Sequence, residues 1–306
     1  MKVYTDIDQF KKVNNPIVTI GTFDGVHIGH QKIIQRIKEI AKKENGETVL
    51  LTFFPHPRMV LQPGNDDLKL LTTQEEKIEL LEKEGVDHLI IYPFTAAFSK
   101  LSSVEFIKSI LVSKIGTKKL VIGYDHHFGR NREGSFKHLK EFGPVYGFEV
   151  EEIPAQDIDN INVSATKIRN AILEGDIETA NLYLGHLYSL RGEVVAGDKI
   201  GRTIGFPTAN IKVKERYKLI PAHGVYAVDV HYNKKVFKGM LNIGIRPTVH
   251  NNQQTIEVNI FNFDENIYGQ EIIIFLKKRI RNEEKFDNLE ALKKQLAKDK
   301  QTAIAI

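Results

Sequence analysis

Short apolar runs alternate with amphipathic stretches between residues 16 and 155. The apolar runs predict buried strands at Ile17 to Gly21, Thr48 to Phe53, His88 to Tyr92, Lys119 to Ile122 and Glu149 to Ile153. Between them, apolar residues recur at helical spacing in Ile33, Ile34, Ile37, Ile40 and Ala41, and again in Ile78, Leu80 and Leu81. Strands that alternate with helices indicate an α/β fold, in which helices cover a parallel sheet.

The pattern changes after two helical segments, one near Ser164 to Leu173 and a shorter one from Gly175 to Gly185 that ends in a glycine. Strands bounded by Gly, Asn and Pro follow at Tyr188 to Val195, Gly224 to Tyr232, Lys235 to Leu241, Gln254 to Phe261 and Glu271 to Lys277. This spacing favours a small antiparallel barrel or sandwich. A basic amphipathic helix from Asn288 to Lys298 is expected to close over it. We therefore expect two domains, residues 1–184 and 185–306, with the second short helix as the linker.

The composition narrows the class of protein. A length of 306 residues favours two modules, and 42% hydrophobic with 27% charged residues is typical of a globular protein. The absence of cysteine excludes disulfides, thiolate metal sites and cysteine nucleophiles. Acidic residues come before any apolar run at the start, and no stretch approaches the ~18 consecutive apolar residues that a membrane span needs, so we expect a cytoplasmic protein without signal peptide or membrane span. The net charge of +4 suits a phosphorylated small molecule as well as RNA, and no basic stripe with interleaved aromatics favours nucleic acid. Oligomerisation cannot be read from these features.

The segment Gly21-Thr-Phe-Asp-Gly-Val-His-Ile-Gly-His30 follows a predicted strand and opens a predicted helix. In α/β folds this position presents unpaired backbone N–H groups to phosphate. Gly29 permits close approach, and His27 and His30 can direct hydrogen-bond donors at one phosphate. The segment is suited to nucleotidyl transfer, in which charge grows on a phosphate. It resembles the first signature of the HxGH adenylyltransferase superfamily, and the whole string resembles the bacterial FAD synthetase branch.

That resemblance implies a Rossmann-like domain and a second signature, for which the chain has Val163-Ser-Ala-Thr-Lys-Ile-Arg169. Ser164 is a plausible N-cap, and Thr166 and Arg169 can reach an ATP phosphate. Alone, the string would be no more than a capped basic helix. Ala165 stands where a second serine is common. The implied ATP-binding residues are Gly21, Phe23, Asp24, Gly29, His30, Ser164, Thr166 and Arg169, with His27, His30 and Arg169 catalytic.

Two further strings fit the same branch and imply the flavin side of that site. Phe53-Phe-Pro-His-Pro57 ends a predicted strand with rigid, ring-rich residues, and Gly123 to Gly134 is a glycine-framed loop with His126 where phenylalanine is usual. The implied flavin contacts are Pro55, His56, Pro57, Asp125 and Phe128. A proline-stiffened turn and a polar surface loop are the alternatives for the isolated strings.

The segment from Gly197 to Asn210 resembles the nucleotide loop of riboflavin kinases, including their Pro-Thr-Ala-Asn string. A loop that folds over ATP phosphates is the expected structure. Thr208 and Asn210 are hard oxygen ligands at alternate positions, so on an extended segment both face one way and can share a Mg²⁺ ion with the nucleotide. The implied ATP-binding residues are Gly197, Lys199, Gly201, Arg202, Gly205, Pro207, Thr208 and Asn210.

Strict alternation from Thr255 to Ile260 places Thr255, Glu257 and Asn259 on one face of a strand and the aliphatic residues on the other. An exposed glutamate in a strand is common. Riboflavin kinases, however, carry a glutamate in this strand as the base for the ribityl hydroxyl, and Glu257 is the matching residue. Asn259 replaces the histidine usual there. Arg281 and Phe286 match implied flavin contacts.

Together the two resemblances cover nearly the whole chain. They imply ATP-dependent phosphorylation of riboflavin to FMN by the C-terminal module, and adenylyl transfer from ATP to FMN, giving FAD and pyrophosphate, by the N-terminal module. The implied substrates are riboflavin, FMN and ATP, and the implied cofactor is Mg²⁺. One alternative is a nucleotidyltransferase for another substrate with a degenerate second module. Another is a flavin-sensing or RNA-binding regulator without turnover.

Overall fold

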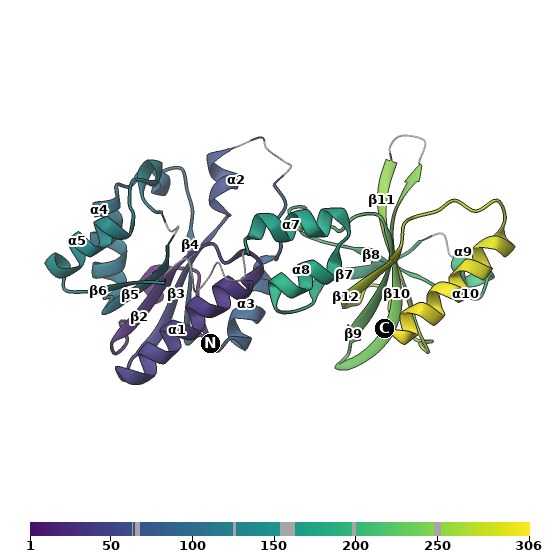
Figure 1. Cartoon of the computed structure of the whole chain (residues 1–306), viewed down its shortest axis with the longest axis horizontal. Coiled ribbons are helices and arrows are strands. Elements are labelled where there is room, and N and C mark those ends of the chain that lie inside the picture. Colours follow the sequence, from purple (N-terminus) through teal and green to yellow (C-terminus); the bar gives the residue numbers. More distant parts are fainter. Residues whose placement is uncertain (63, 65–67, 125–126, 154–162, 198–199, 248–251) are drawn as a thin grey trace. The chain divides into compact units, whose positions relative to one another are not determined.

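The computed structural model describes residues 1–62, 64, 68–124, 127–153, 163–197, 200–247 and 252–306. The chain forms two compact units, Met1–Ala165 and Thr166–Ile306. Each unit has its own sheet, and Figure 1 shows the elements of both. Among the described residues, no helix combines the length and the apolar character needed to cross a membrane.

The first unit is built on a six-stranded sheet in which every pair of neighbours is parallel. Its order is β1 (Lys2–Tyr4), β4 (His88–Pro93), β3 (Glu47–Phe54), β2 (Pro16–Ile20), β5 (Lys119–Gly123) and β6 (Glu149–Ile153). The predicted α/β class and five predicted strands are confirmed. Strand β1 was not predicted, because three residues are too few to show a period.

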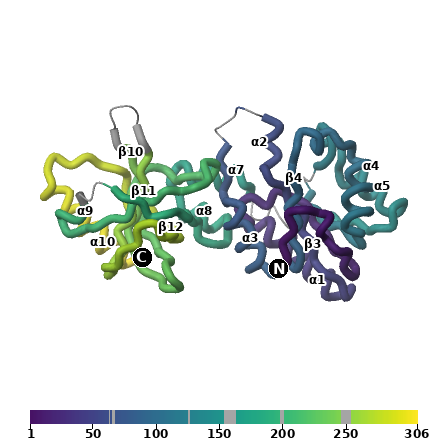
Figure 2. The backbone as a smooth tube through the Cα atoms, turned by 180° about the vertical axis from the view of Figure 1, so that it is seen from behind, coloured from purple at the N-terminus to yellow at the C-terminus, as the bar shows by residue number. Residues whose placement is uncertain are grey.

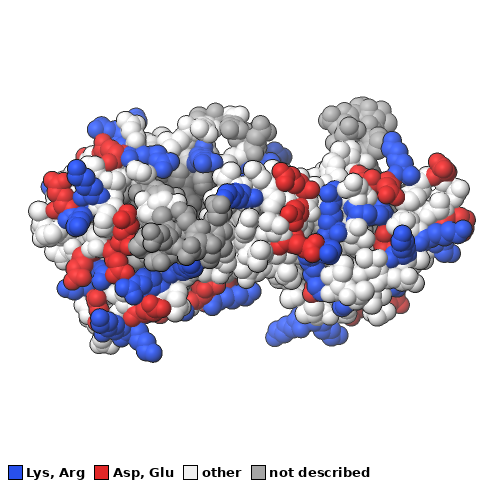
Figure 3. Space-filling model, viewed as in Figure 1, with Lys and Arg blue, Asp and Glu red and all other residues white. Residues whose placement is uncertain are grey.

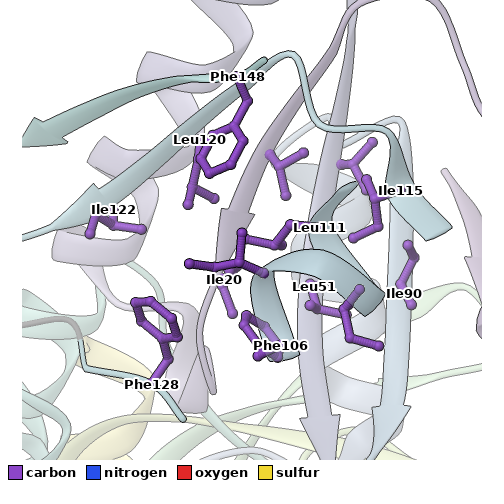
Figure 4. Packing of buried hydrophobic residues seen from close by; sticks show 14 of the residues in the cluster. Ile20, Leu51, Ile90, Phe106, Leu111, Ile115, Leu120, Ile122, Phe128 and Phe148 are labelled. Atoms are coloured by element: carbon purple, nitrogen blue, oxygen red, sulfur yellow. The ribbon is translucent and has the colours of Figure 1, made fainter. Parts of the chain in front are cut away.

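Helices cover both faces of this sheet, since alternate residues of β2 belong to different cores. Ile17 packs with Ile37 and Ile40 of α1 (Ile28–Lys43). Val18 packs in the opposite core with Ile110 and other residues of α4 (Ser103–Phe106) and the π-helical segment η4 (Ile107–Ile115). Figure 4 shows this second core from close by. The remaining helices are α2 (Pro57–Leu61), α3 (Gln74–Lys83), α5 (Phe136–Tyr146) and the short η1 (Ile7–Gln9), η2 (Asp24–Val26), η3 (Phe98–Lys100) and η5 (Arg130–Arg132).

The second unit contains a closed antiparallel barrel. Around the barrel the strands are β10 (Lys235–Pro247), β11 (Asn252–Ile260), β8 (Ala209–Lys212), β7 (Tyr188–Val195), β12 (Glu271–Arg281) and β9 (Gly224–Tyr232). The barrel was one of two architectures that strand spacing allowed, and closure decides between them. Strand β8 has four residues and was not predicted.

Helices flank the barrel. Helix α10 (Leu289–Ala305) packs against β9, β10 and β12, as expected, and is longer than predicted (Figure 2). Helices α7 (Ala165–Glu174) and α8 (Ile177–Leu184) come before β7. The segment expected as a linker is α8, which ends at Gly185 in a left-handed conformation (φ 75°) and contacts β12 and β7. Its Asn181 side chain donates to the Leu276 carbonyl and accepts from the Tyr188 backbone N–H.

Charged side chains of both signs are interspersed on the face shown in Figure 3. The small excess of basic residues is thus not gathered into one patch on that face.

Candidate active sites

Three of the four predicted adenylyl-transfer strings follow neighbouring strands of the parallel sheet, at the carboxyl ends of these strands. Strand β2 lies between β3 and β5, so the strand order reverses beside it. In open α/β sheets, ligands bind outside the carboxyl ends of strands at such a reversal. Residues 21–30 follow β2, residues 55–57 follow β3 and residues 124–134 follow β5. Asp125 and His126 lie outside the described residues.

The two histidines lie at the start of helix α1. His27 occupies the N-cap without a side-chain hydrogen bond to the helix, and His30 lies in the first turn after Gly29. Their rings stack with centroids 3.7 Å apart, and the Phe23 ring lies 4.8 Å from that of His30. An N-terminus without a side-chain cap leaves first-turn N–H groups for an anion.

The environment of His30 favours its neutral form. Burial lowers the pKa of His30 well below 6.5, and the nearby charges of His27 and Lys77 lower this pKa further. Its Nδ1 atom is buried and has no hydrogen-bond partner within the described part of the chain. A buried ring nitrogen without a protein partner is unusual, and a catalytic role or a bound water or ion accounts for such atoms.

Two buried charged residues hold the loop between β2 and α1. The Asp24 carboxylate is 2% exposed, and its Oδ1 accepts hydrogen bonds from the backbone N–H groups of Leu71 (2.9 Å) and Thr72 (3.2 Å). The Lys77 ammonium is 4% exposed and donates to the Thr22 carbonyl at 2.8 Å. Asp24, predicted to contact ATP, therefore anchors the loop in this structure.

Lys77 was not among the predicted site residues. Burial lowers the pKa of Lys77 to about 8, while the Asp24 charge acts in the opposite direction. A sequence signal existed, because Lys77 lies four residues before the fully buried Leu81 and so shares the apolar face of α3.

Three of the five predicted flavin contacts of this unit, His56, Pro57 and Phe128, have structural roles. His56 is buried and caps α2, accepting the backbone N–H of Arg58 at 3.2 Å, and Pro57 is the first residue of that helix. The ring of Phe128 is 8% exposed and packs 5.6 Å from that of Phe106 in the core (Figure 4). This burial favours a packing role for Phe128. Pro55 is exposed between β3 and α2.

The second signature begins helix α7. Ser164 directly precedes the helix, and Thr166 lies in its first turn, as predicted. Thr166 is exposed and Arg169 is half-buried, whereas Ile168 between them is buried in the second unit.

The second unit has a cavity of about 520 Å³ beside the barrel. The predicted polar row of β11 and apolar residues of α10 line it. Six predicted kinase residues are among the lining residues: Gly201, Thr208, Asn210, Glu257, Arg281 and Phe286. Gly197, Arg202, Gly205 and Pro207 lie outside its lining, and Lys199 lies outside the described residues. The structure thus brings together residues up to 85 positions apart in the sequence, from Gly201 to Phe286.

The predicted metal ligands and the predicted base are neighbours in this cavity. Asn210 of β8 pairs in register with Glu257 of β11. The Thr208 hydroxyl donates to the Glu257 carboxylate at 3.2 Å. Asn259, which replaces the histidine usual in riboflavin kinases, also has a role. Its Nδ2 donates to the Pro207 carbonyl at 2.6 Å and so holds the segment that contains Thr208 against β11.

Two glycines of the predicted nucleotide loop lie in close approach to other residues, Gly197 to a side chain and Gly201 to the backbone. A Cβ atom on Gly197 would lie 2.1 Å from Asn210 Nδ2, and one on Gly201 would lie 2.2 Å from the Phe206 carbonyl oxygen. Residues Ile200–Thr203 form a short helix, α9, where a loop was expected. Its turn is closed by a hydrogen bond from the Phe206 N–H to the Gly201 carbonyl at 2.8 Å.

The described residues contain no group of three or more His, Asp or Glu side chains that could hold a metal by themselves. The hard oxygens of Thr208 and Asn210 fit Mg²⁺, which is commonly bound by one or two protein ligands together with substrate phosphates and water.

Comparison with known proteins identifies the family of each part of the chain. The FAD synthetase family model matches residues 9–167, and the riboflavin kinase family model matches residues 184–306. A bifunctional riboflavin kinase/FMN adenylyltransferase of Buchnera aphidicola subsp. Schizaphis graminum is 43% identical over 305 residues, covering 98% of this chain and 96% of that protein. The one from Listeria monocytogenes is 42% identical over 288 residues, covering 94% and 91%.

A solved structure described as a macrolide-efflux protein from Streptococcus pneumoniae is 32% identical, with a TM-score of 0.90 over 99% of this chain and 98% of that one. The solved protein thus shares the fold of this chain. With two family models and near full-length relatives in agreement, the chain belongs to the family of bifunctional riboflavin kinases/FMN adenylyltransferases.

Proposed function

We propose that the two activities of this riboflavin kinase and FMN adenylyltransferase have separate sites on the chain. FMN adenylyl transfer is assigned to the carboxyl ends of β2, β3 and β5, and riboflavin phosphorylation to the cavity beside the barrel. The observation that carries the proposal is the gathering of Thr208, Asn210, Glu257 and Arg281 around one cavity. We place the boundary between the catalytic domains at Gly185, which is supported by family matches that end at residue 167 and begin at residue 184.

In the kinase site, Glu257 is the base for the ribityl hydroxyl of riboflavin. Its carboxylate takes the proton as the hydroxyl oxygen bonds to the γ-phosphorus of ATP and the bond to the bridging oxygen of ADP breaks. Thr208 and Asn210 would hold Mg²⁺, which neutralises charge on the phosphates when bound. The hydrogen bond from Thr208 orients the carboxylate beside these ligands.

In the adenylyl-transfer site, His27, His30 and the first turn of α1 bind the triphosphate of ATP. A phosphate oxygen of FMN attacks the α-phosphorus, and pyrophosphate leaves. Charge grows on the phosphate oxygens in this transition state, so fixed donors stabilise it more than the ground state. Ser164, Thr166 and Arg169 are assigned to ATP by their signature alone.

One experiment tests the division. The purified full chain is incubated with ATP, Mg²⁺ and either riboflavin or FMN, and the flavins are separated by chromatography. We expect FMN and FAD from riboflavin, and FAD from FMN. FAD synthesis from FMN that is lost in Glu257→Gln but kept in His30→Ala would show that the activities are assigned to the wrong units.

A further inference from the structure

A buried ion pair lies behind the cavity wall of the second unit. Arg281, at the end of β12, lines the cavity, whereas its partner Asp299 on α10 does not and is 1% exposed. The Arg281 Nε donates to both Asp299 oxygens at 3.1 and 3.0 Å, and Nη2 donates to Oδ2 at 2.8 Å. Asp299 therefore occupies the side edge of the guanidinium, in the bidentate geometry that gives strong, directional pairs.

The remaining donors of Arg281 can be counted. A guanidinium has five N–H groups. Nε and one N–H of Nη2 bind Asp299, and one N–H of Nη1 binds the Asn282 carbonyl at 2.9 Å. Within the described part of the chain, one N–H on each terminal nitrogen is left for a ligand.

Further contacts fix this arrangement. The guanidinium carbon lies 5.6 Å from the centre of the Phe286 ring, which also lines the cavity. Gln295 Nε2 donates to Asp299 Oδ1 at 2.7 Å from one turn earlier on α10. The charge of Asp299 is thereby satisfied although the carboxylate is buried, as a buried charge requires.

We infer that Asp299 is a positioning residue for riboflavin in the kinase reaction. It acts through Arg281 by holding the guanidinium so that the two remaining N–H groups can donate to acceptors on the edge of a planar ligand. The carbonyl oxygens and ring nitrogens of isoalloxazine are acceptors of this kind. The C-terminal helix is thus a functional part of the kinase site. The inference rests on the proposed assignment of Arg281 to flavin binding.

The test is the steady-state kinase reaction of the full chain. Asp299→Asn keeps the size of the side chain but removes the charge and one acceptor. We expect the KM for riboflavin to rise roughly tenfold, the scale of one charge-assisted hydrogen bond. The KM for ATP and the rate of FAD formation from supplied FMN should stay unchanged. Glu290→Gln, the same change at an exposed position of α10, is the matched control and should leave all three unchanged.

Arg281→Met and the double variant separate positioning from general stability. If Asp299 acts through Arg281, the double variant binds riboflavin no more weakly than Arg281→Met alone. An unchanged riboflavin KM in Asp299→Asn, with a raised one in Arg281→Met, overturns the inference and leaves the assignment of Arg281 standing. An unchanged KM in Arg281→Met overturns both.

If Asp299 had a purely structural role, Asp299→Asn would raise the KM values for both riboflavin and ATP, or its effect on the riboflavin KM would add fully to that of Arg281→Met. Either result overturns the inference. Should Asp299→Asn fail to fold, Gln295→Met decides instead. It removes only the second donor to Asp299, so a smaller rise in the riboflavin KM supports the inference, and an unchanged KM overturns it.

Discussion

The Thr208 hydroxyl donates a hydrogen bond of 3.2 Å to the Glu257 carboxylate, so the proposed metal ligand and the proposed base are in direct contact. Glu257→Gln keeps the shape of the side chain and one oxygen acceptor but cannot take a proton. We expect FMN formation from riboflavin to fall by about 10²–10⁴-fold, the usual contribution of a general base. Conversion of supplied FMN to FAD by the same preparation is the internal control and should continue. Riboflavin phosphorylation at the normal rate would exclude Glu257 as the base.

Asn210, the second proposed metal ligand, pairs in register with Glu257. Asn210→Leu replaces the side-chain oxygen with carbon at similar volume, so we expect riboflavin phosphorylation to be lost at every Mg²⁺ concentration tried. The measurement is the initial rate as a function of Mg²⁺. Thr255→Val, which changes a cavity-lining residue of the neighbouring strand β11, is measured for comparison. An unchanged maximal rate and Mg²⁺ midpoint in Asn210→Leu would count against the metal role.

His30 lies in the first turn of α1 with its ring stacked on that of His27. His30→Ala should reduce FAD formation by about 10²–10³-fold, as expected when one preorganised donor is removed from a transition state. FMN formation from riboflavin should barely change, because the kinase residues belong to the other unit. Unimpaired FAD synthesis in the His27→Ala/His30→Ala double variant would refute the assignment.

Lys77 predicts a pH dependence of stability. Burial lowers its pKa in the folded chain to about 8, against 10.5 when exposed. Between pH 8 and 10.5 the unfolded chain therefore binds more protons at Lys77 than the folded chain does. Burial of Lys77 thus lowers the free energy of unfolding below pH 8, and this loss of stability is relieved as pH rises from 8 to about 10.5. The full difference corresponds to about 3 kcal/mol.

Lys77→Met removes this titration. We expect the urea midpoint of the unaltered chain to rise relative to that of Lys77→Met as pH increases from 8 to 10. Other lysines titrate equally in both proteins, so the comparison isolates Lys77. Parallel pH profiles would contradict a lowered pKa of this ammonium group.

Truncation tests the independence of the kinase unit. A fragment of residues 166–306 should convert riboflavin to FMN and make no FAD, because it holds Thr208, Asn210 and Glu257 but lacks His27 and His30. A fragment of residues 187–306 should keep the activity at lower stability, since it loses α8 and the Asn181 hydrogen bonds to Leu276 and Tyr188. Thermal melts and riboflavin turnover measure both. A first fragment that is folded but inactive would show that phosphorylation needs the N-terminal unit.

The elements themselves could largely be predicted from local patterns. Five strands of the sheet and five of the barrel follow from runs of apolar residues, because burial on one or both faces imposes a period on the chain. Strands β1 and β8 have three and four residues, and take their structure from pairing with β4 and with β7 and β11. Their formation depends on long-range hydrogen bonds rather than on local pattern.

By itself, the sequence determined which chemical groups are available and how they are spaced locally. The alternation of Thr208 and Asn210 and the helix start at His30 are properties of short segments, so their local placement could be predicted. Tertiary structure alone decided that β3, β2 and β5 are adjacent, that Lys77 is buried under the Thr22 carbonyl, and that Asp299 holds Arg281. The physical reason is that a buried polar group must find its partner wherever the fold brings one, and these partners lie far apart along the chain.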